Sequence, residues 1–87
     1  MELEEIMGKV RKFIRERFKI SENDADFNDD VHLFDYGYID SFGAVELAVH
    51  VEKVFSITVN VSDSNVHPMN TVREIAAFVK KRQEGLI

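Results

Sequence analysis

The stretch YGYIDSFGAVELAVHVEKVF, residues 36–55, decides how this chain folds. From Ser41 onward its apolar residues follow a helical spacing, and Asp40 and Ser41 stand where such a helix would begin. Aspartate and serine are favoured at helix starts because their side chains accept hydrogen bonds from free backbone amides. We therefore predict a helix from about residue 40 to residue 55. The side chains expected to face the core are those of Phe42, which would seal the first turn, and of Val45, Leu47, Val51 and Phe55.

Each end of the chain is predicted to form a further amphipathic helix. Apolar residues recur every three or four positions near the N-terminus; they are Leu3, Ile6, Met7, Val10, Phe13, Ile14 and Phe18. Near the C-terminus, T-V-R-E is a capping box in which the Thr71 hydroxyl and the Glu74 carboxylate satisfy each other's exposed amides. The helix that follows should run to about Gln83. It is expected to bury Val72, Ile75, Ala76 and Val79, with Phe78 at the edge.

The connecting segments complete an all-helical plan. Residues 20–40 hold seven acids and no Lys or Arg, and we predict a long ordered loop pinned to the core, with Gly37 at a backbone angle that other residues avoid. S-I-T-V-N-V, residues 56–61, alternates like a strand but has no partner strand, so we predict an extended connection. A short helix is expected within residues 62–66, before Pro68. The predicted fold is an all-α, small four-helix bundle, with three main helices and a short third helix, forming a single domain over residues 1–87.

Composition restricts the functions open to the chain. The formal net charge of −5 at pH 7 argues against nucleic acid as the main partner. Because the chain has no cysteine, it supplies no thiolate of its own. The N-terminus lacks a signal-peptide core, and no apolar run approaches membrane-spanning length. We expect a cytoplasmic monomer with no membrane partner.

Ser41 is the residue whose chemistry needs explaining. A serine hydroxyl is a poor nucleophile unless a base takes its proton. His50 lies about two and a half turns further along the same predicted helix, and His32 and His67 are in loops with no evident orienting group. We therefore expect no catalytic residue and no enzyme activity: Ser41 receives chemistry rather than performs it. Plain helix capping by Asp40 and Ser41 is the alternative.

A calcium loop is a rival interpretation of residues 24–35. Asp24, Asp26, Asn28 and Asp30 occupy the first, third, fifth and seventh positions of such a loop. The sixth position is Asp29 rather than glycine, however, and the twelfth is an aspartate rather than the usual bidentate glutamate. We therefore predict no metal site, and keep a weak, EF-hand-like calcium-binding or interaction module as the alternative of another class.

The longer string LFDYGYIDSFGAVELAVHVEKVFSITV, residues 33–59, resembles the acyl carrier and peptidyl carrier protein family. The shared features are an Asp-Ser-hydrophobic triplet at Asp40, Ser41 and Phe42 after a glycine-containing loop, a helix that ends in Phe55, and an F-x-I-x-V exit. The preceding helix and the following T-x-x-E-I helix also fit. The resemblance therefore covers nearly the whole chain.

This resemblance implies a covalent cofactor. In the family the matching serine, here Ser41, is esterified by 4′-phosphopantetheine, which a separate magnesium-dependent transferase donates from coenzyme A. The thiol of the arm holds an acyl or aminoacyl group as a thioester, so the reactive sulfur comes from the cofactor. Asp40 would orient the helix start and contact the transferase. The implied partners are this phosphopantetheinyl transferase and the acyl- or aminoacyl-loading and acyl-processing enzymes.

The resemblance is compatible with more than one kind of cargo on the arm. The family as a whole implies an acyl carrier protein of fatty acid, polyketide or specialised-metabolite biosynthesis. The form G-Y-I-D-S-F-G, with Gly37 four residues before the serine, is more similar to the D-alanyl carrier proteins, which serve cell-envelope modification. The spacing from Val59 to Thr71 also resembles that subgroup, whereas S-D-S-N-V-H-P-M-N, residues 62–70, does not carry its aromatic and acidic pattern.

The family also implies a docking surface on the helix that follows the serine. By that resemblance Glu46 and Glu52 would meet Arg or Lys side chains of partner enzymes, with Val49 as an apolar contact. Carboxylates that merely keep the protein soluble are the alternative. His50 and Lys53 make this helix less acidic than in typical fatty-acid carriers, which indicates a different partner set.

Overall fold

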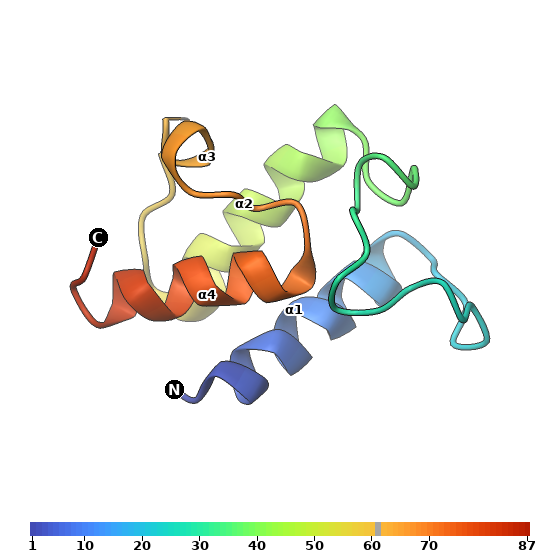
Figure 1. Cartoon of the computed structure of the whole chain (residues 1–87), viewed down its shortest axis with the longest axis horizontal. Coiled ribbons are helices and arrows are strands. Elements are labelled where there is room, and N and C mark those ends of the chain that lie inside the picture. The colour runs from blue at the N-terminus through green and yellow to red at the C-terminus, as the bar shows by residue number, and fades with distance from the viewer. Residues whose placement is uncertain (61) are drawn as a thin grey trace.

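The computed structural model describes residues 1–60 and 62–87 and contains four helices within those ranges (Figure 1). They are α1 (Leu3–Arg17), α2 (Ser41–Phe55), α3 (Asp63–Val66) and α4 (Val72–Gln83). No β-strand occurs in the described residues, so the predicted all-α bundle with a short third helix is confirmed. Helix α4 packs along α1 and also touches α2, while α3 sits on the far side of α4 from the N-terminus (Figure 1).

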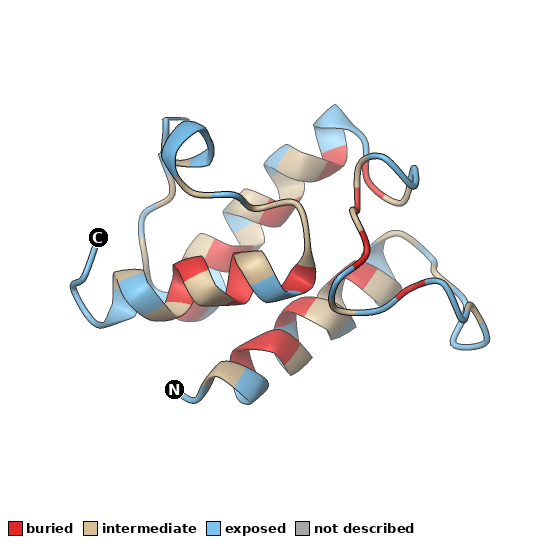
Figure 2. Ribbon diagram, viewed as in Figure 1, coloured by how far each residue is buried: buried red, intermediate tan, exposed pale blue. Residues whose placement is uncertain are grey.

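The core forms where the apolar faces of the main helices meet. Figure 2 shows the buried positions of α1 and α4 turned toward each other and toward α2. The largest fully buried side chains are those of Ile6, Met7, Val10, Ile14, Leu33, Val72 and Val79. Burying one such side chain contributes about 1.5–3 kcal/mol. The inward faces predicted for the first and last helices are therefore confirmed.

The predictions for Val45 and Phe78 are wrong. Val45 is 65% exposed, because α2 turns the line Gly43, Leu47, Val51 and Phe55 inward, and a residue two positions from Leu47 lies about 200° around the helix. Phe78 was expected at the edge of α4 but is buried. The Arg82 guanidinium lies over its ring, 4.8 Å from the centroid, and the His67 ring packs against it from the segment that follows α3.

The long loop between α1 and α2 is ordered by contacts with the start of α4. The Leu33 amide donates to the Asn70 carbonyl at 2.8 Å, and the Arg73 amide donates to the Asp29 carbonyl at 3.0 Å. The buried apolar anchors of the loop are Phe27, Val31, Leu33 and Ile39, and Gly37 has the predicted positive φ, at +80°. These contacts therefore fix the position of Asp40 and Ser41 at the end of the loop, where α2 begins.

Helix α4 begins with a modified form of the predicted capping box. The Thr71 hydroxyl accepts a hydrogen bond from the Glu74 amide at 3.0 Å, as predicted. The Glu74 carboxylate, however, accepts from the amide of Asn70 and not from that of Thr71. The two side chains therefore still accept from backbone amides at the start of α4 that have no carbonyl partner within the helix.

Arg82 fixes the segment between α2 and α3 on α4. Its guanidinium donates to the Thr58 carbonyl at 2.7 Å and forms an ion pair with Asp63 at 3.0 Å. The Asn60 amide and then the Arg82 guanidinium, both donating to the Asp63 carboxylate, hold its pKa below the usual value. Residues 57–60 carry neither helix nor strand, in line with the predicted connection, whose last residue lies outside the described residues.

Acid should loosen this attachment. Because the folded-state pKa of Asp63 is depressed, its carboxylate stabilises the fold above its unfolded pKa of about 4, and this contribution is lost as the pH falls through the folded-state pKa. We expect the free energy of unfolding of the wild type to fall more between about pH 5 and about pH 2 than that of Asp63→Asn, measured by urea denaturation. Asp26→Asn, at an exposed side chain, is the matched loss of one carboxylate. An acid-induced loss in Asp63→Asn as large as that of the wild type would contradict this role.

Candidate functional site

Ser41 lies exposed at the first position of α2. The residue before it, Asp40, is the N-cap, and its carboxylate accepts a hydrogen bond from the Gly43 amide at 2.8 Å. The Ala44 amide donates to the Asp40 carbonyl at 2.9 Å and closes the first turn. The predicted helix start is confirmed, and it leaves the Ser41 hydroxyl at the tip of a helix in reach of solvent.

Gly43 fixes the position of that helix tip, a role that the sequence pattern did not predict. A Cβ built on Gly43 would lie 2.6 Å from Cε1 of Phe18 and 2.9 Å from the Ile39 side chain. The end of α1 and the end of the long loop therefore approach the α2 backbone at a distance that only glycine permits. The signal was available in the sequence as a glycine in the first turn of a helix, where it lowers helix propensity.

The same contact turns Phe42 outward. Adjacent residues of a helix are about 100° apart, so with Gly43 facing the core Phe42 points away from it. Phe42 is 81% exposed. The prediction that Phe42 seals the first turn in the core is therefore wrong.

None of the three histidines acts on Ser41 in this arrangement. The ring of His50 stacks on Phe13 with centroids 3.7 Å apart, and burial lowers its pKa. His32 accepts a hydrogen bond from the Asp35 amide, and the His67 ring packs against a side chain of α4. The hydroxyl is thus presented to other molecules rather than paired with a base.

The helix tip suits a phosphate ester on the Ser41 oxygen. The amides of Ser41 and Phe42 belong to the first turn of α2, where no carbonyl lies one turn earlier in the helix to accept from them. The N-terminal end of a helix carries partial positive charge, which favours an anion there. The residues present therefore fit a phosphodiester at this position.

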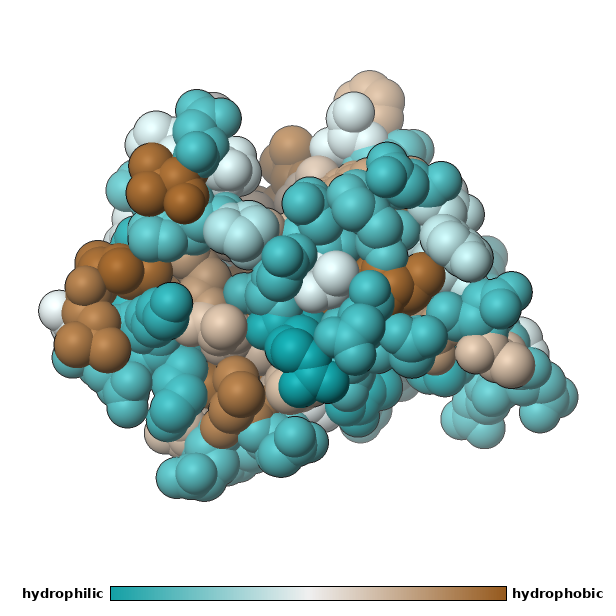
Figure 3. Space-filling view, viewed as in Figure 1, coloured by the Kyte–Doolittle hydropathy of each residue, from teal (hydrophilic) through white to brown (hydrophobic). Residues whose placement is uncertain are grey.

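A hollow with apolar walls runs beside α2, between this helix and the segment that carries α3. It has a volume of about 610 Å³, and its lining includes Phe34, Val45, Val49, Met69, Ile75 and Phe78. In the space-filling view the surface recedes between the lobe of α3 and the N-terminal end of α2 (Figure 3). Val45 and Val49 therefore border both the hollow and the outer face of the helix.

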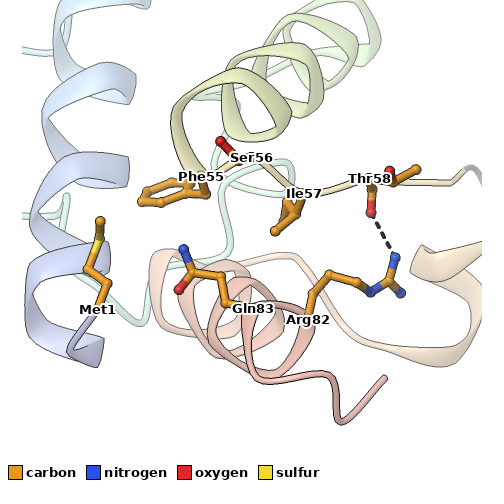
Figure 4. A pocket seen from close by; sticks show the side chains of 7 residues that line it. All are labelled: Met1, Phe55, Ser56, Ile57, Thr58, Arg82 and Gln83. Atoms are coloured by element: carbon orange, nitrogen blue, oxygen red, sulfur yellow. Dashed lines mark hydrogen bonds between the residues drawn. The ribbon is translucent and has the colours of Figure 1, made fainter.

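A second hollow lies at the other end of α2 (Figure 4). It has a volume of about 520 Å³ and is lined by Met1, Phe55, Ser56, Ile57, Thr58, Arg82 and Gln83. Fourteen helical steps separate Ser41 from Phe55, so this hollow lies about 20 Å from the serine. Its charged group, the Arg82 guanidinium, points to the Thr58 carbonyl, which makes it part of the attachment of α3 rather than of the serine site.

Three acids of the long loop bind protein groups at separate places. Asp29 pairs with Arg11 through two hydrogen bonds of 2.8 and 2.9 Å, Asp30 pairs with Arg73, and Asp24 accepts from the Tyr38 hydroxyl. Burial of the Tyr38 hydroxyl, and to a smaller extent its hydrogen bond to Asp24, raises the pKa of Tyr38 to about 12. Among residues 1–60 and 62–87 no group of three or more acidic, histidine or cysteine side chains is placed to hold a metal ion. The ion pairs of Asp29 with Arg11 and of Asp30 with Arg73 give the loop a structural role.

The predicted docking residues Glu46, Val49 and Glu52 all lie on α2, but the two carboxylates are hydrogen-bonded within the protein. Val49 is 44% exposed. Glu46 accepts from the Arg17 guanidinium through both carboxylate oxygens, and Glu52 accepts from the Val59 amide at 2.9 Å. Both carboxylates therefore already serve the packing of this chain.

A small helical bundle that presents one hydroxyl on a helix tip is the arrangement of a carrier. The model of the phosphopantetheine attachment site family matches residues 8–79, which include Ser41, and the chain belongs to this family. The family expected from the sequence is thereby confirmed. The protein is a carrier rather than an enzyme, and its cofactor is covalently attached 4′-phosphopantetheine, which supplies a thiol that this chain lacks.

Three relatives of similar length are named D-alanyl carrier protein. The chain is 43% identical over 56 residues to a D-alanyl carrier protein of Streptococcus uberis, covering 64% of this chain and 71% of that protein. It is 42% identical over 71 residues to a D-alanyl carrier protein of Streptococcus mutans, covering 82% and 86% of the two chains. A D-alanyl carrier protein of Abiotrophia defectiva is 37% identical over 57 residues, covering 66% and 72%.

Of the helices described, none has the length and apolar character needed to cross a membrane.

A pair of glycine substitutions tests the packing at Gly43. We expect Gly43→Ala to lower the free energy of unfolding by about 1–3 kcal/mol, because the added methyl group would force Phe18 and Ile39 aside. Gly8→Ala is the matched control, since nothing lies within 4 Å of its built Cβ in α1, and it should stabilise by about 0.5–1 kcal/mol. Urea denaturation measures both. A stabilised Gly43→Ala variant would show that the helix tip is not fixed by this contact.

Proposed function

We propose that Ser41 is the residue to which 4′-phosphopantetheine is attached, and that the carrier presents an acyl or aminoacyl group as a thioester on this arm. The exposed position of Ser41 at the α2 tip is the observation that carries the proposal. A modifying enzyme can reach the hydroxyl, and the first-turn amides favour the phosphate that would be joined to it. The family match supports the proposal because it spans this residue.

The neighbours of Ser41 would prepare the site without reacting. Asp40 holds the first turn by its bond to the Gly43 amide, so the hydroxyl does not depend on a mobile loop. Its carboxylate is also exposed enough to meet a transferase. The α2 face beyond Ser41, which includes the predicted docking residues Glu46, Val49 and Glu52, would be the surface nearest to any enzyme working on the arm.

For the cargo we propose D-alanine, a small aminoacyl group. The support is the identity of 42–43% to carriers named D-alanyl carrier protein, together with the G-Y-I-D-S-F-G form around the serine. The partners would then be a phosphopantetheinyl transferase and a ligase that loads the amino acid. The single domain over residues 1–87, the monomeric state and the cytoplasmic location remain predictions.

A longer acyl group is the second candidate, favoured by the apolar hollow beside α2. Its volume of about 610 Å³ and its lining of valine, phenylalanine, methionine and isoleucine are suited to a hydrocarbon chain rather than to a charged amino acid. Under this candidate the carrier would serve fatty acid, polyketide or specialised-metabolite biosynthesis.

Intact-mass spectrometry tests the attachment. The protein is incubated with coenzyme A, magnesium and a broad-specificity phosphopantetheinyl transferase, and we expect one pantetheinyl addition that Ser41→Ala abolishes. Ser62→Ala, at another exposed serine hydroxyl, is the control and should be modified like the wild type. A wild type left unmodified by several transferases, or a Ser41→Ala variant that gains the same mass, would refute the assignment.

The cargo is tested on the carrier purified from its own host. Hydroxylamine cleaves the thioester, and the released hydroxamate is identified by mass spectrometry. We expect alanine hydroxamate of the D configuration. Release of a fatty or polyketide acyl group instead would replace the first candidate with the second and leave the carrier role intact.

A further inference from the structure

Glu52 carries a charge that has no counter-charge within the described residues. Four other acids of the chain form ion pairs with arginines; they are Asp29, Asp30, Glu46 and Asp63. Oε2 of Glu52 accepts from the Val59 amide at 2.9 Å, whereas Oε1 accepts no hydrogen bond from residues 1–60 or 62–87. Because Glu52 is partly buried, its carboxylate is costly to leave unpaired. Its free oxygen is therefore suited to a cation.

The Glu52 carboxylate borders the hollow beside α2. Three apolar neighbours on the same helix also line this hollow; they are Val45, Ala48 and Val49. Of the described residues in the lining, Glu52 is the only one with an ionisable side chain. Apolar walls lower the local dielectric constant and strengthen the attraction between opposite charges. A cationic group that enters this hollow therefore meets one carboxylate in apolar surroundings.

Ser41 and Glu52 lie on the same side of α2. They are separated by eleven residues along the helix, which rotate the direction of the side chain by only about 20° in total and advance about 17 Å along the axis. Ala48 lies between them on this side, and its methyl group leaves room along the helix surface. An extended phosphopantetheine arm has about the length of five extended residues, roughly 17 Å. The cargo on an arm at Ser41 is therefore within reach of Glu52.

We propose that the Glu52 carboxylate binds the ammonium group of an aminoacyl cargo carried on the arm at Ser41. This inference rests on the proposed function and deepens it, because it names the residue that distinguishes an aminoacyl group from a plain acyl group. Oε1 would accept from the ammonium group while Oε2 keeps its bond to the Val59 amide. A hydrogen bond between two charged groups is stronger than one between neutral groups. An acyl group without nitrogen makes no such bond.

The peptide group that orients Glu52 is itself fixed. Its N–H belongs to Val59 and donates to Glu52. Its carbonyl belongs to Thr58 and accepts from the Arg82 guanidinium at 2.7 Å, and Arg82 is in turn paired with Asp63. The carboxylate is thus held in one orientation before any cargo arrives, which lowers the entropic cost of binding.

The test compares two cargoes on the full chain. A broad-specificity phosphopantetheinyl transferase loads the arm from D-alanyl-coenzyme A or from propionyl-coenzyme A, whose acyl group has the same carbon skeleton without the amine. We expect the ¹⁵N–¹H NMR signal of the Val59 amide, which is bonded to Glu52, to differ between the two loaded forms of the wild type. This comparison does not depend on any variant.

Two variants then assign the difference to one carboxylate. In Glu52→Gln, which keeps an acceptor for the Val59 amide and should therefore stay folded, the Val59 signals of the two loaded forms should coincide. Glu46→Gln is the matched control, because it removes the other carboxylate of α2, and it should keep the difference. Urea denaturation checks that both variants are folded.

Titration of the alanyl amine gives a second readout, followed by NMR of the alanyl methyl group. A neighbouring carboxylate favours the protonated amine, so the pKa of this amine should be higher on the wild type than on Glu52→Gln. We expect the proton affinity of the amine to be about threefold or more greater on the wild type. Glu46→Gln should keep the wild-type value.

Three results would overturn the inference. The first is a Val59 signal that is the same in the D-alanyl and propionyl forms of the wild type. The second is a difference that persists in Glu52→Gln. The third is a difference lost equally in Glu46→Gln and Glu52→Gln, which would assign it to the total charge of α2. A wild type that no transferase loads would instead refute the proposed function, and this inference with it.

Discussion

The close approach of Phe18 to the backbone of Gly43 is the contact on which the rest of the structure depends. It brings together the end of α1, the end of the long loop at Ile39 and the first turn of α2, with no room for a side chain at position 43. Once Gly43 faces the core, the rotation of α2 is fixed, and Leu47, Val51 and Phe55 follow it inward at intervals of four residues. The exposed positions of Ser41 and Phe42 are consequences of that rotation.

The acidic loop between α1 and α2 supports this contact because it is itself fixed to α1 and α4. Its acids at positions 29 and 30 bind Arg11 of α1 and Arg73 of α4, and its backbone is bonded to the start of α4. Loops of this length are commonly mobile or functional. Here Asp29 and Asp30 instead hold the loop to two helices. The result is that a helix tip that must be accessible is also well positioned.

The sequence was sufficient for the elements whose signals are local. The helical spacing predicted α1 and α4, the Asp40–Ser41 pair predicted the start of α2, and Gly37 predicted a positive φ. The sequence was insufficient where the answer depended on which way a helix is turned. Phe42 and Val45 were assigned to the core because they are apolar, and only the tertiary contact at Gly43 turns them outward. Glu46 is bonded to Arg17, 29 positions away, and Glu52 to the amide of Val59 in a connection without regular structure. The spacing of apolar residues reveals neither contact.

These features combine into one account of a carrier that contributes position rather than reactivity. The chain supplies a held hydroxyl, the exposed apolar side chains of Phe42 and Val45 beside it, and a hollow along the same helix, while the cofactor supplies the thiol. Tandem mass spectrometry of the carrier from its own host identifies the serine that bears the arm. The tryptic peptide of residues 20–53 contains both Ser21 and Ser41, and its fragment ions separate the two. We expect the phosphopantetheinyl group on Ser41. A phosphopantetheinyl group on Ser21, or a peptide that is wholly unmodified, would refute the role of Ser41.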